Sequence, residues 1–170
     1  MHVLHLLHAI SHRPPVTVSG GTRLQDLLQA GATTVHRRST LFVVSDFISE
    51  PGWHKTLGQL AQRHEVVAVR LVDPLEQDLP DLGLVPMMDA ETGEQLLVDT
   101  SNPGFRQRFA RLATERETAL RESLAAAGVD TLELSTRDDL ADAILRFTEL
   151  RKRRSQLAAG GGSLRAPMAV

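Results

Sequence analysis

The sequence predicts an α/β fold with a mostly parallel sheet, and three observations lead to this prediction. Short apolar runs of strand length alternate with segments whose apolar residues recur at helical spacing. The two clearest runs, 40–46 and 65–73, each end in an acidic residue and are separated by one helical segment, as in a strand-helix-strand unit. The length of 170 residues fits one domain with a core of its own.

The N-terminal segment is predicted to form two helices. Residues 2–10 place apolar side chains at helical spacing, and the pattern stops at residues 14–15, which are both proline. Thr22 stands three residues before Gln25, which is the arrangement of a capping box that opens a helix. We expect Gly31 to close this second helix.

Two strands and a connecting helix are predicted next. The run 40–46 is apolar up to its polar end, which is typical of a parallel strand that is covered on both faces and has neighbours on both edges. A turn at 51–52 leads into a helical pattern over 53–64. The valine-rich run 65–73 predicts the following strand.

A hairpin and a long helix are predicted after these strands. Residues 74–100 contain three prolines and a Glu-Thr-Gly-Glu turn at 91–94, which indicate a β-hairpin appended to the main sheet. Asn102 followed by Pro103 is a favourable start for a helix, and we expect this helix to continue to Gly128.

The C-terminal part is predicted to hold a third strand at 129–134 and a last helix. Thr136 with Asp139 fits the N-terminal cap of this helix. Its buried stripe is expected to consist of Leu140, Ile144, Phe147 and Leu150. The domain is predicted to cover 1–154, and the small-residue segment 155–170 is predicted to be a disordered tail.

The composition excludes several classes of function. The net charge of −2 argues against nucleic acid or an anionic membrane as the partner of the whole protein. The absence of cysteine excludes disulfides, thiolate metal sites and cysteine nucleophiles. No apolar run approaches the roughly 18 residues of a membrane span, and no signal pattern opens the chain, so we expect a cytoplasmic protein.

Several segments, taken in serial order, resemble one family. They are Arg37–Phe47, Arg63–Arg70, Asp73–Glu76, Leu79-Pro80 with Gly83, Asp89–Glu94 and Arg151–Arg154. Together they resemble the C-terminal part of the von Willebrand factor A-like proteins associated with MoxR ATPases, domain-of-unknown-function family 58. The resemblance implies a Rossmann-like, von Willebrand A-type fold, here a partial domain that lacks its N-terminal strands.

The resemblance also implies a place for a metal site. Thr22 matches by position the metal-site threonine of the family, and Asp46 matches its acidic residue. The Asp-x-Ser-x-Ser loop of that site is absent from the sequence, and one hydroxyl with one carboxylate makes a poor Mg²⁺ site. We therefore expect no cofactor for this chain, and Mg²⁺ only in a complete homologue.

Asp46 and Asp73 are the predicted interaction residues, because ligands of open α/β sheets bind at the carboxyl ends of the strands. The structural alternative is that each aspartate caps the turn that follows it, and that Thr22 caps a helix.

The resemblance implies a non-enzymatic protein-interaction module whose partner is a MoxR-type AAA+ ATPase or its client. The edge of residues 40–46 is expected to pair with a second copy of the chain, because an exposed apolar edge invites pairing. The alternative function is a Mg²⁺-dependent phosphohydrolase that uses Asp46, assisted by Asp73 or Asp89, with Arg70 stabilising charge.

Three further groups have a functional and a structural interpretation. They are His2, His5, His8 and His12, then Arg146, Arg151, Lys152, Arg153 and Arg154, and finally the pair Ser45 and His64. The histidines either bind a metal or are solvated, and the basic cluster either contacts nucleic acid or complements a helix dipole. The serine lacks the Gly-x-Ser-x-Gly elbow of a nucleophile.

Overall fold

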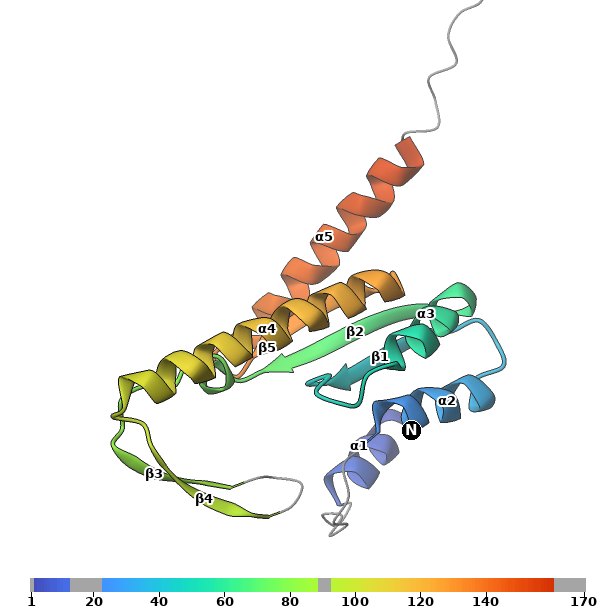
Figure 1. The fold of residues 1–170 in the computed structure, drawn as a ribbon. Coiled ribbons are helices and arrows are strands. Elements are labelled where there is room, and N and C mark those ends of the chain that lie inside the picture. Colours follow the sequence, from blue (N-terminus) through green and yellow to red (C-terminus); the bar gives the residue numbers. More distant parts are fainter. Residues whose placement is uncertain (1, 13–22, 89–92, 161–170) are drawn as a thin grey trace, which may run out of the picture.

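The computed structural model describes residues 2–12, 23–88 and 93–160 (Figure 1). Its helices are α1 His2–Ser11, α2 Leu24–Thr34, α3 Trp53–Arg63, α4 Pro103–Ala127 and α5 Leu140–Gly160, with a 3₁₀ turn η1 at Pro74–Glu76. Its strands are β1 Thr40–Ser45, β2 Glu65–Val72, β3 Leu84–Met88, β4 Gln95–Asp99 and β5 Asp130–Ser135. The predicted α/β order is confirmed. None of the described helices is both long enough and apolar enough to cross a bilayer.

The main sheet has three parallel strands in the order β1-β2-β5. The mostly parallel sheet expected of a Rossmann-like, von Willebrand A-type fold is therefore present, and so is the added hairpin, formed by β3 and β4. The described residues of the hairpin share no strand pairing with the main sheet, and the hairpin extends away from it (Figure 1). Within the described residues β1 pairs with β2 alone, so it is an edge strand.

The prediction that β1 is covered on both faces is wrong. Leu41 and Val43 pack against the core, whereas Phe42 and Val44 are 63% and 57% exposed. The reason is the placement of the helices. Core residues of α2, α3 and α4 cover the face of the sheet that carries Leu41 and Val43. Helix α5 packs mainly against β5.

The core lies between β1, β2 and these three helices. Leu57 of α3 is fully buried, and the ring of Trp53 lies 5.3 Å from that of Phe47. Helices α3 and α4 approach closely at Gly58, where an added Cβ would lie 3.4 Å from the carbonyl oxygen of Ala127. A methyl group at this position would make an ordinary van der Waals contact with α4, whereas a larger side chain would meet the α4 backbone.

The start of α2 differs from the predicted capping box. Its N-cap is Arg23, which makes no side-chain capping bond, and the Gln25 amide donates instead to the Thr56 hydroxyl at 2.7 Å. The backbone N–H of Leu24 donates to the hydroxyl of Ser49 at 3.0 Å. A side chain from a distant loop thus takes over the capping role.

Two helices continue past their predicted ends. Gly31 does not adopt the left-handed conformation that ends a helix, and α2 continues to Thr34. Helix α5 continues to Gly160, so residues 155–160 are helical rather than part of a disordered tail. Their alanine, leucine and glutamine favour helix, which explains the extension. Residues 161–170 lie outside the described residues.

Helix α5 begins at a different cap and buries less than predicted. Asp139 alone provides the side-chain cap, accepting a hydrogen bond from the N–H of Asp142 at 3.1 Å. Leu140, Ile144 and Leu150 of the predicted buried stripe are 57%, 42% and 57% exposed. Figure 1 shows the reason, since α5 runs away from the sheet, and among the described elements it packs mainly against β5.

Candidate functional site at the carboxyl end of the sheet

Asp46 and Asp73 leave the main sheet at the same edge. β1 and β2 are parallel, with Ser45 beside Arg70, and β2 continues for two more residues. The turn η1 then places Glu76 near both aspartates. Burial, followed by the negative charges of Asp46 and Asp73, raises the pKa of Glu76 above its ordinary value. Three carboxylates therefore share the carboxyl end of the sheet.

Asp46 stabilises the loop that follows β1. Its Oδ1 accepts hydrogen bonds from the N–H of Ile48 at 3.0 Å and from the hydroxyl of Ser45 at 3.3 Å. Phe47 has a φ of 61°, a left-handed conformation that costs a non-glycine residue about 1–2 kcal/mol. Burial of Phe47 against Trp53 compensates for this cost and directs the exposed Asp46 outward.

Asp73 has a similar local role. Its Oδ1 accepts a hydrogen bond from the N–H of Leu75 at 3.0 Å and caps η1. The structural alternative, in which each aspartate caps the following turn, is thus confirmed for both Asp46 and Asp73. Each still has a second carboxylate oxygen without a hydrogen bond to any described residue, so each remains available to a partner.

The start of α2 lies beside the loop that follows Asp46. Besides the bond from Leu24 to Ser49, the Arg23 guanidinium pairs with Glu50 at 3.1 Å. Thr22 itself lies outside the described residues. No group of three or more His, Asp or Glu side chains in the described part of the chain is placed to hold a metal ion. The metal site of Thr22 and Asp46 therefore stays a prediction.

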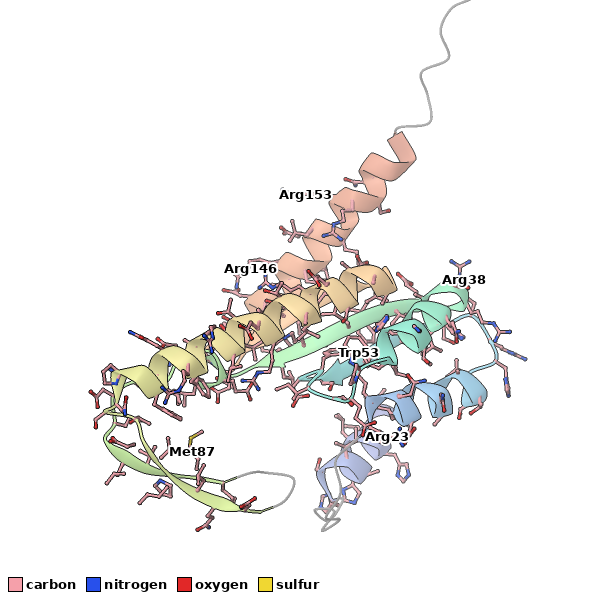
Figure 2. All side chains as sticks on the ribbon, viewed as in Figure 1. Arg23, Arg38, Trp53, Met87, Arg146 and Arg153 are labelled. Atoms are coloured by element: carbon pink, nitrogen blue, oxygen red, sulfur yellow. The ribbon has the colours of Figure 1, made fainter. Side chains whose placement is uncertain are left out.

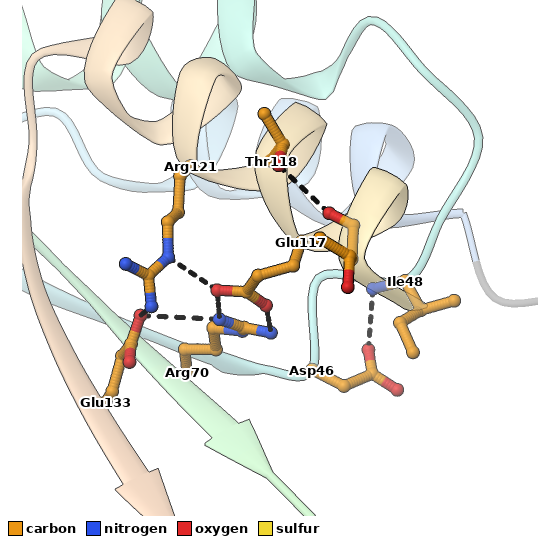
Figure 3. Close-up of polar contacts among 8 residues, drawn as sticks. Asp46, Ile48, Arg70, Glu117, Thr118, Arg121 and Glu133 are labelled. Carbon is orange, nitrogen blue, oxygen red and sulfur yellow. Dashed lines mark hydrogen bonds and ion pairs between the residues drawn. The ribbon is translucent and has the colours of Figure 1, made fainter. Parts of the chain in front are cut away.

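A partly buried ion-pair network lies near this end of the sheet (Figure 3). Arg70 of β2 binds Glu117 of α4 through two bonds, of 2.8 and 2.5 Å, and Glu133 of β5 at 3.3 Å. Arg121 donates to Glu117 at 2.6 Å. The bond from Arg70 lowers the pKa of Glu117, and Glu117 in turn raises the pKa of Arg70.

The network connects three elements that are distant in sequence. It also occupies both terminal nitrogens of Arg70, the cation that the phosphohydrolase alternative requires. Sequence reasoning missed Glu117, Glu133 and Arg121. The available signal was an arginine inside a valine-rich strand, because a buried guanidinium needs a carboxylate partner.

The base of the hairpin is fixed by polar contacts. Thr100 is fully buried, and its hydroxyl accepts from the N–H of Leu82 at 2.9 Å and donates to the carbonyl of Gly83 at 2.7 Å. Arg106 of α4 donates to the carbonyl of Thr100 and pairs with Asp81 at 3.4 Å. These contacts anchor the hairpin to the start of α4.

The remaining predicted residues are not brought into one site. Ser45 ends β1, whereas His64 precedes β2, so they lie at opposite ends of the sheet, about 20 Å apart along the strands at a rise of about 3.3 Å per residue. His12 lies with its Nδ1 2.9 Å from the carbonyl of His8 on the exposed helix α1. Asp89 lies outside the described residues.

Part of the basic cluster of α5 has a structural role. Arg151 pairs with Glu65 and with Asp130, at 3.0 Å in the second case, and Arg154 pairs with Asp130 at 3.0 Å. These ion pairs attach α5 to the amino ends of β2 and β5. Two of the five basic residues therefore form ion pairs with described residues.

Comparison with known proteins identifies three relatives of interest. An uncharacterised protein of Mycobacterium avium is 35% identical over 148 residues, which are 85% of this chain and 84% of that protein. An uncharacterised protein of Mycobacterium tuberculosis is 38% identical over 120 residues, which are 69% of this chain and 37% of that protein. An uncharacterised protein in the moxR 3′ region of Paracoccus denitrificans is 33% identical over 98 residues, which are 57% of this chain and 92% of that protein.

The chain thus spans little more than a third of the length of the Mycobacterium tuberculosis relative. Among solved structures, the conserved hypothetical protein BatB from Bacteroides thetaiotaomicron is similar with a TM-score of 0.49 and 12% identity, over 89% of this chain and 69% of that chain. The family model described as protein of unknown function DUF58 matches residues 1–119. With this match over more than two thirds of its length, the chain belongs to the DUF58 family.

Proposed function

We propose that the chain is a non-enzymatic protein-interaction module and that its partner is a MoxR-type AAA+ ATPase. The observation that carries this proposal is the hairpin arm, which consists of β3 and β4. Four of its apolar side chains, Leu84, Met88, Leu96 and Leu97, are 65–66% exposed. Figure 2 shows the arm, with Met87 labelled, standing apart from the main sheet.

The arm exposes apolar side chains on both of its faces. Met87 is opposite Leu96, and Pro86 is opposite Leu97, so these two cross-strand pairs point to opposite sides of the hairpin. An isolated two-stranded hairpin is marginally stable in water, and contiguous exposed apolar surface marks interaction sites. A partner that covers both faces of the arm would stabilise the hairpin and would also bury its exposed apolar side chains.

The carboxylates of Asp46 and Asp73 lie at the end of the sheet from which the chain continues through η1 and residues 77–83 into the arm (Figure 1). A partner seated on the arm would therefore meet a negatively charged edge. The location of one relative in the moxR 3′ region supports a MoxR-type ATPase as this partner. The proposal includes a cytoplasmic location, where ATP is available to such an ATPase, and no cofactor for this chain.

The test is a binding measurement between the full chain and a purified MoxR-type ATPase of the same organism, with and without ATP. Leu96→Ser combined with Leu97→Ser should weaken binding by about tenfold or more, since exposed apolar anchors dominate interface energies. Leu112→Ser on α4 and Leu145→Ser on α5 change side chains that are 52% and 61% exposed, and serve as controls. Equal affinities for all variants, or no binding by the unmodified chain, would contradict the proposal.

An activity assay separates this proposal from the phosphohydrolase alternative. The module should not turn over p-nitrophenyl phosphate with Mg²⁺ present. Mg²⁺-dependent turnover that disappears in a folded Asp46→Asn variant would favour the hydrolase instead.

A further inference from the structure

The outer edge of β1 has the features of a strand that pairs with another chain. Within the described residues, β1 has a strand neighbour on one side only. Its six residues, Thr40–Ser45, include no charge, proline or glycine, which are the devices that normally protect an edge from pairing. Phe42 and Val44 on its open face are 63% and 57% exposed. As far as residues 2–12, 23–88 and 93–160 show, the edge is therefore unprotected and apolar.

The two ends of β1 carry opposite charges. Arg37 and Arg38 precede the strand, both are exposed, and neither takes part in an ion pair with another described residue. Asp46 follows the strand and is exposed. Figure 2 shows Arg38 at the end of the sheet opposite to the hairpin. A strand that is basic at one end and acidic at the other is complementary to an antiparallel copy of itself.

We propose that two copies of this chain pair through β1, antiparallel and about a twofold axis, to form one continuous six-stranded sheet. The axis is perpendicular to the sheet at Phe42, because this register is the one that uses both the apolar and the charged features. Phe42 then lies opposite Phe42 of the second copy. Arg38 and Asp46, each four residues from Phe42, lie opposite one another across the interface, once on each side of the axis.

The alternation of side chains is consistent with this register. Thr40, Phe42 and Val44 have even positions within β1, so they share the face of the sheet that α2, α3 and α4 leave uncovered. The proposal extends this alternation to Arg38 and Asp46, which flank the strand. Directly opposite residues of antiparallel strands point to the same face, so the apolar cross-strand pairs form one patch with an ion pair at each end. A parallel arrangement would instead place Arg38 beside Arg38 and Asp46 beside Asp46. The charges therefore select the antiparallel partner.

The first test is the mass of the full chain in solution, measured by sedimentation equilibrium over a range of concentrations. The proposal predicts a dimer of about 37 kDa, twice the mass of the 18.6 kDa chain. Arg38→Asp and Asp46→Arg should each raise the dimer dissociation constant about tenfold or more, and the double variant should restore it, since both ion pairs are then rebuilt in reverse. Arg153→Asp on α5 makes the same charge change away from the edge and should have no effect.

The second test uses the absence of cysteine from the chain. A single Phe42→Cys places two thiols opposite one another in the proposed register, so mild oxidation should give a covalent dimer. Val44→Cys faces Thr40 of the second copy and should cross-link much less, and Leu97→Cys on the hairpin arm should not cross-link at all. The proposal would be overturned if the chain were a monomer at every concentration, or if Leu97→Cys cross-linked more than Phe42→Cys. It would also be overturned if the chain formed larger assemblies whose stability did not change with Arg38→Asp or Asp46→Arg.

Discussion

Replacing Glu117 with glutamine tests the ion-pair network that joins β2, α4 and β5. The change removes one negative charge and nearly preserves the shape of the side chain. Arg70, whose side chain is only 9% exposed, would keep a single carboxylate partner, Glu133 at 3.3 Å. Glu133 is itself 45% exposed, so it neutralises the guanidinium less well than Glu117, which is 19% exposed.

The size of the effect follows from this geometry. Removing one partner of a buried ion pair costs about 3–5 kcal/mol of folding free energy. The remaining Glu133 and the glutamine oxygen lower this figure to about 2–3 kcal/mol. Glu115→Gln, two residues away on α4, is the matched control. Its partner Arg111 is 3.8 Å away and both side chains are more than 60% exposed, so its loss should cost only about 0.3 kcal/mol.

Urea unfolding followed by the fluorescence of Trp53 measures both changes, because the indole is 4% exposed in the core. In a thermal experiment the Glu117→Gln variant should melt about 5–10 °C lower than the unmodified chain. Equal free energies of unfolding for the two variants, within about 0.5 kcal/mol, would show that the network does not stabilise the fold.

The pH dependence gives an independent reading of the same pair. Arg70 holds the pKa of Glu117 below its ordinary value of 4.5. A carboxyl group whose pKa is lowered in the folded state stabilises the fold at pH values above its ordinary pKa. This contribution is lost as the pH falls through the lowered pKa of the folded state. The stability difference between the unmodified chain and Glu117→Gln should therefore be constant near pH 7 and shrink below pH 4.5. A difference that is unchanged in acid would contradict the charge-based explanation.

Three further predictions concern single positions. Asn102→Ala removes the side-chain oxygen that caps α4 and should cost about 1 kcal/mol in urea unfolding, and an unchanged midpoint would refute the capping role. Gly58→Ala should be tolerated, because the new Cβ lies 3.4 Å from Ala127, whereas Gly58→Leu should separate α3 from α4 and cost about 1–3 kcal/mol by the same assay. Glu76→Gln should stabilise the fold at pH 7, because burial and the charges of Asp46 and Asp73 raise the pKa of Glu76, and the gain should vanish in acid, where Glu76 is protonated in both states. A Glu76→Gln variant that is destabilised at pH 7 would show that the carboxylate has a partner.

The sequence by itself determined the elements whose signals are local. Asn102 with Pro103 predicted the start of α4, and the structure has the Asn102 side chain accepting hydrogen bonds from the N–H groups of Gly104 and Phe105. Gly128 was expected to end this helix and does so with a φ of 67°. Caps, turns and apolar periodicity involve residues a few positions apart, so the sequence is sufficient to specify them.

The sequence also located Asp46 and Asp73 at the ends of parallel strands, which is a consequence of strand direction alone. It could not show that each aspartate holds the turn after it, or that Ser49 caps α2 from another loop. These contacts join segments whose separation in space depends on the complete fold.

Only the tertiary structure decided which apolar surfaces are buried. The run 40–46 and the stripe of α5 are apolar enough for a core, yet Phe42, Val44 and Leu140 remain exposed. Apolar composition favours burial wherever another element is available to pack, but it does not specify which element that is. The same holds for Arg70, whose place inside a strand became understandable when Glu117 and Glu133, 47 and 63 residues away, were found beside it. Burial and charge pairing depend on contacts between distant segments, and these are properties of the folded chain.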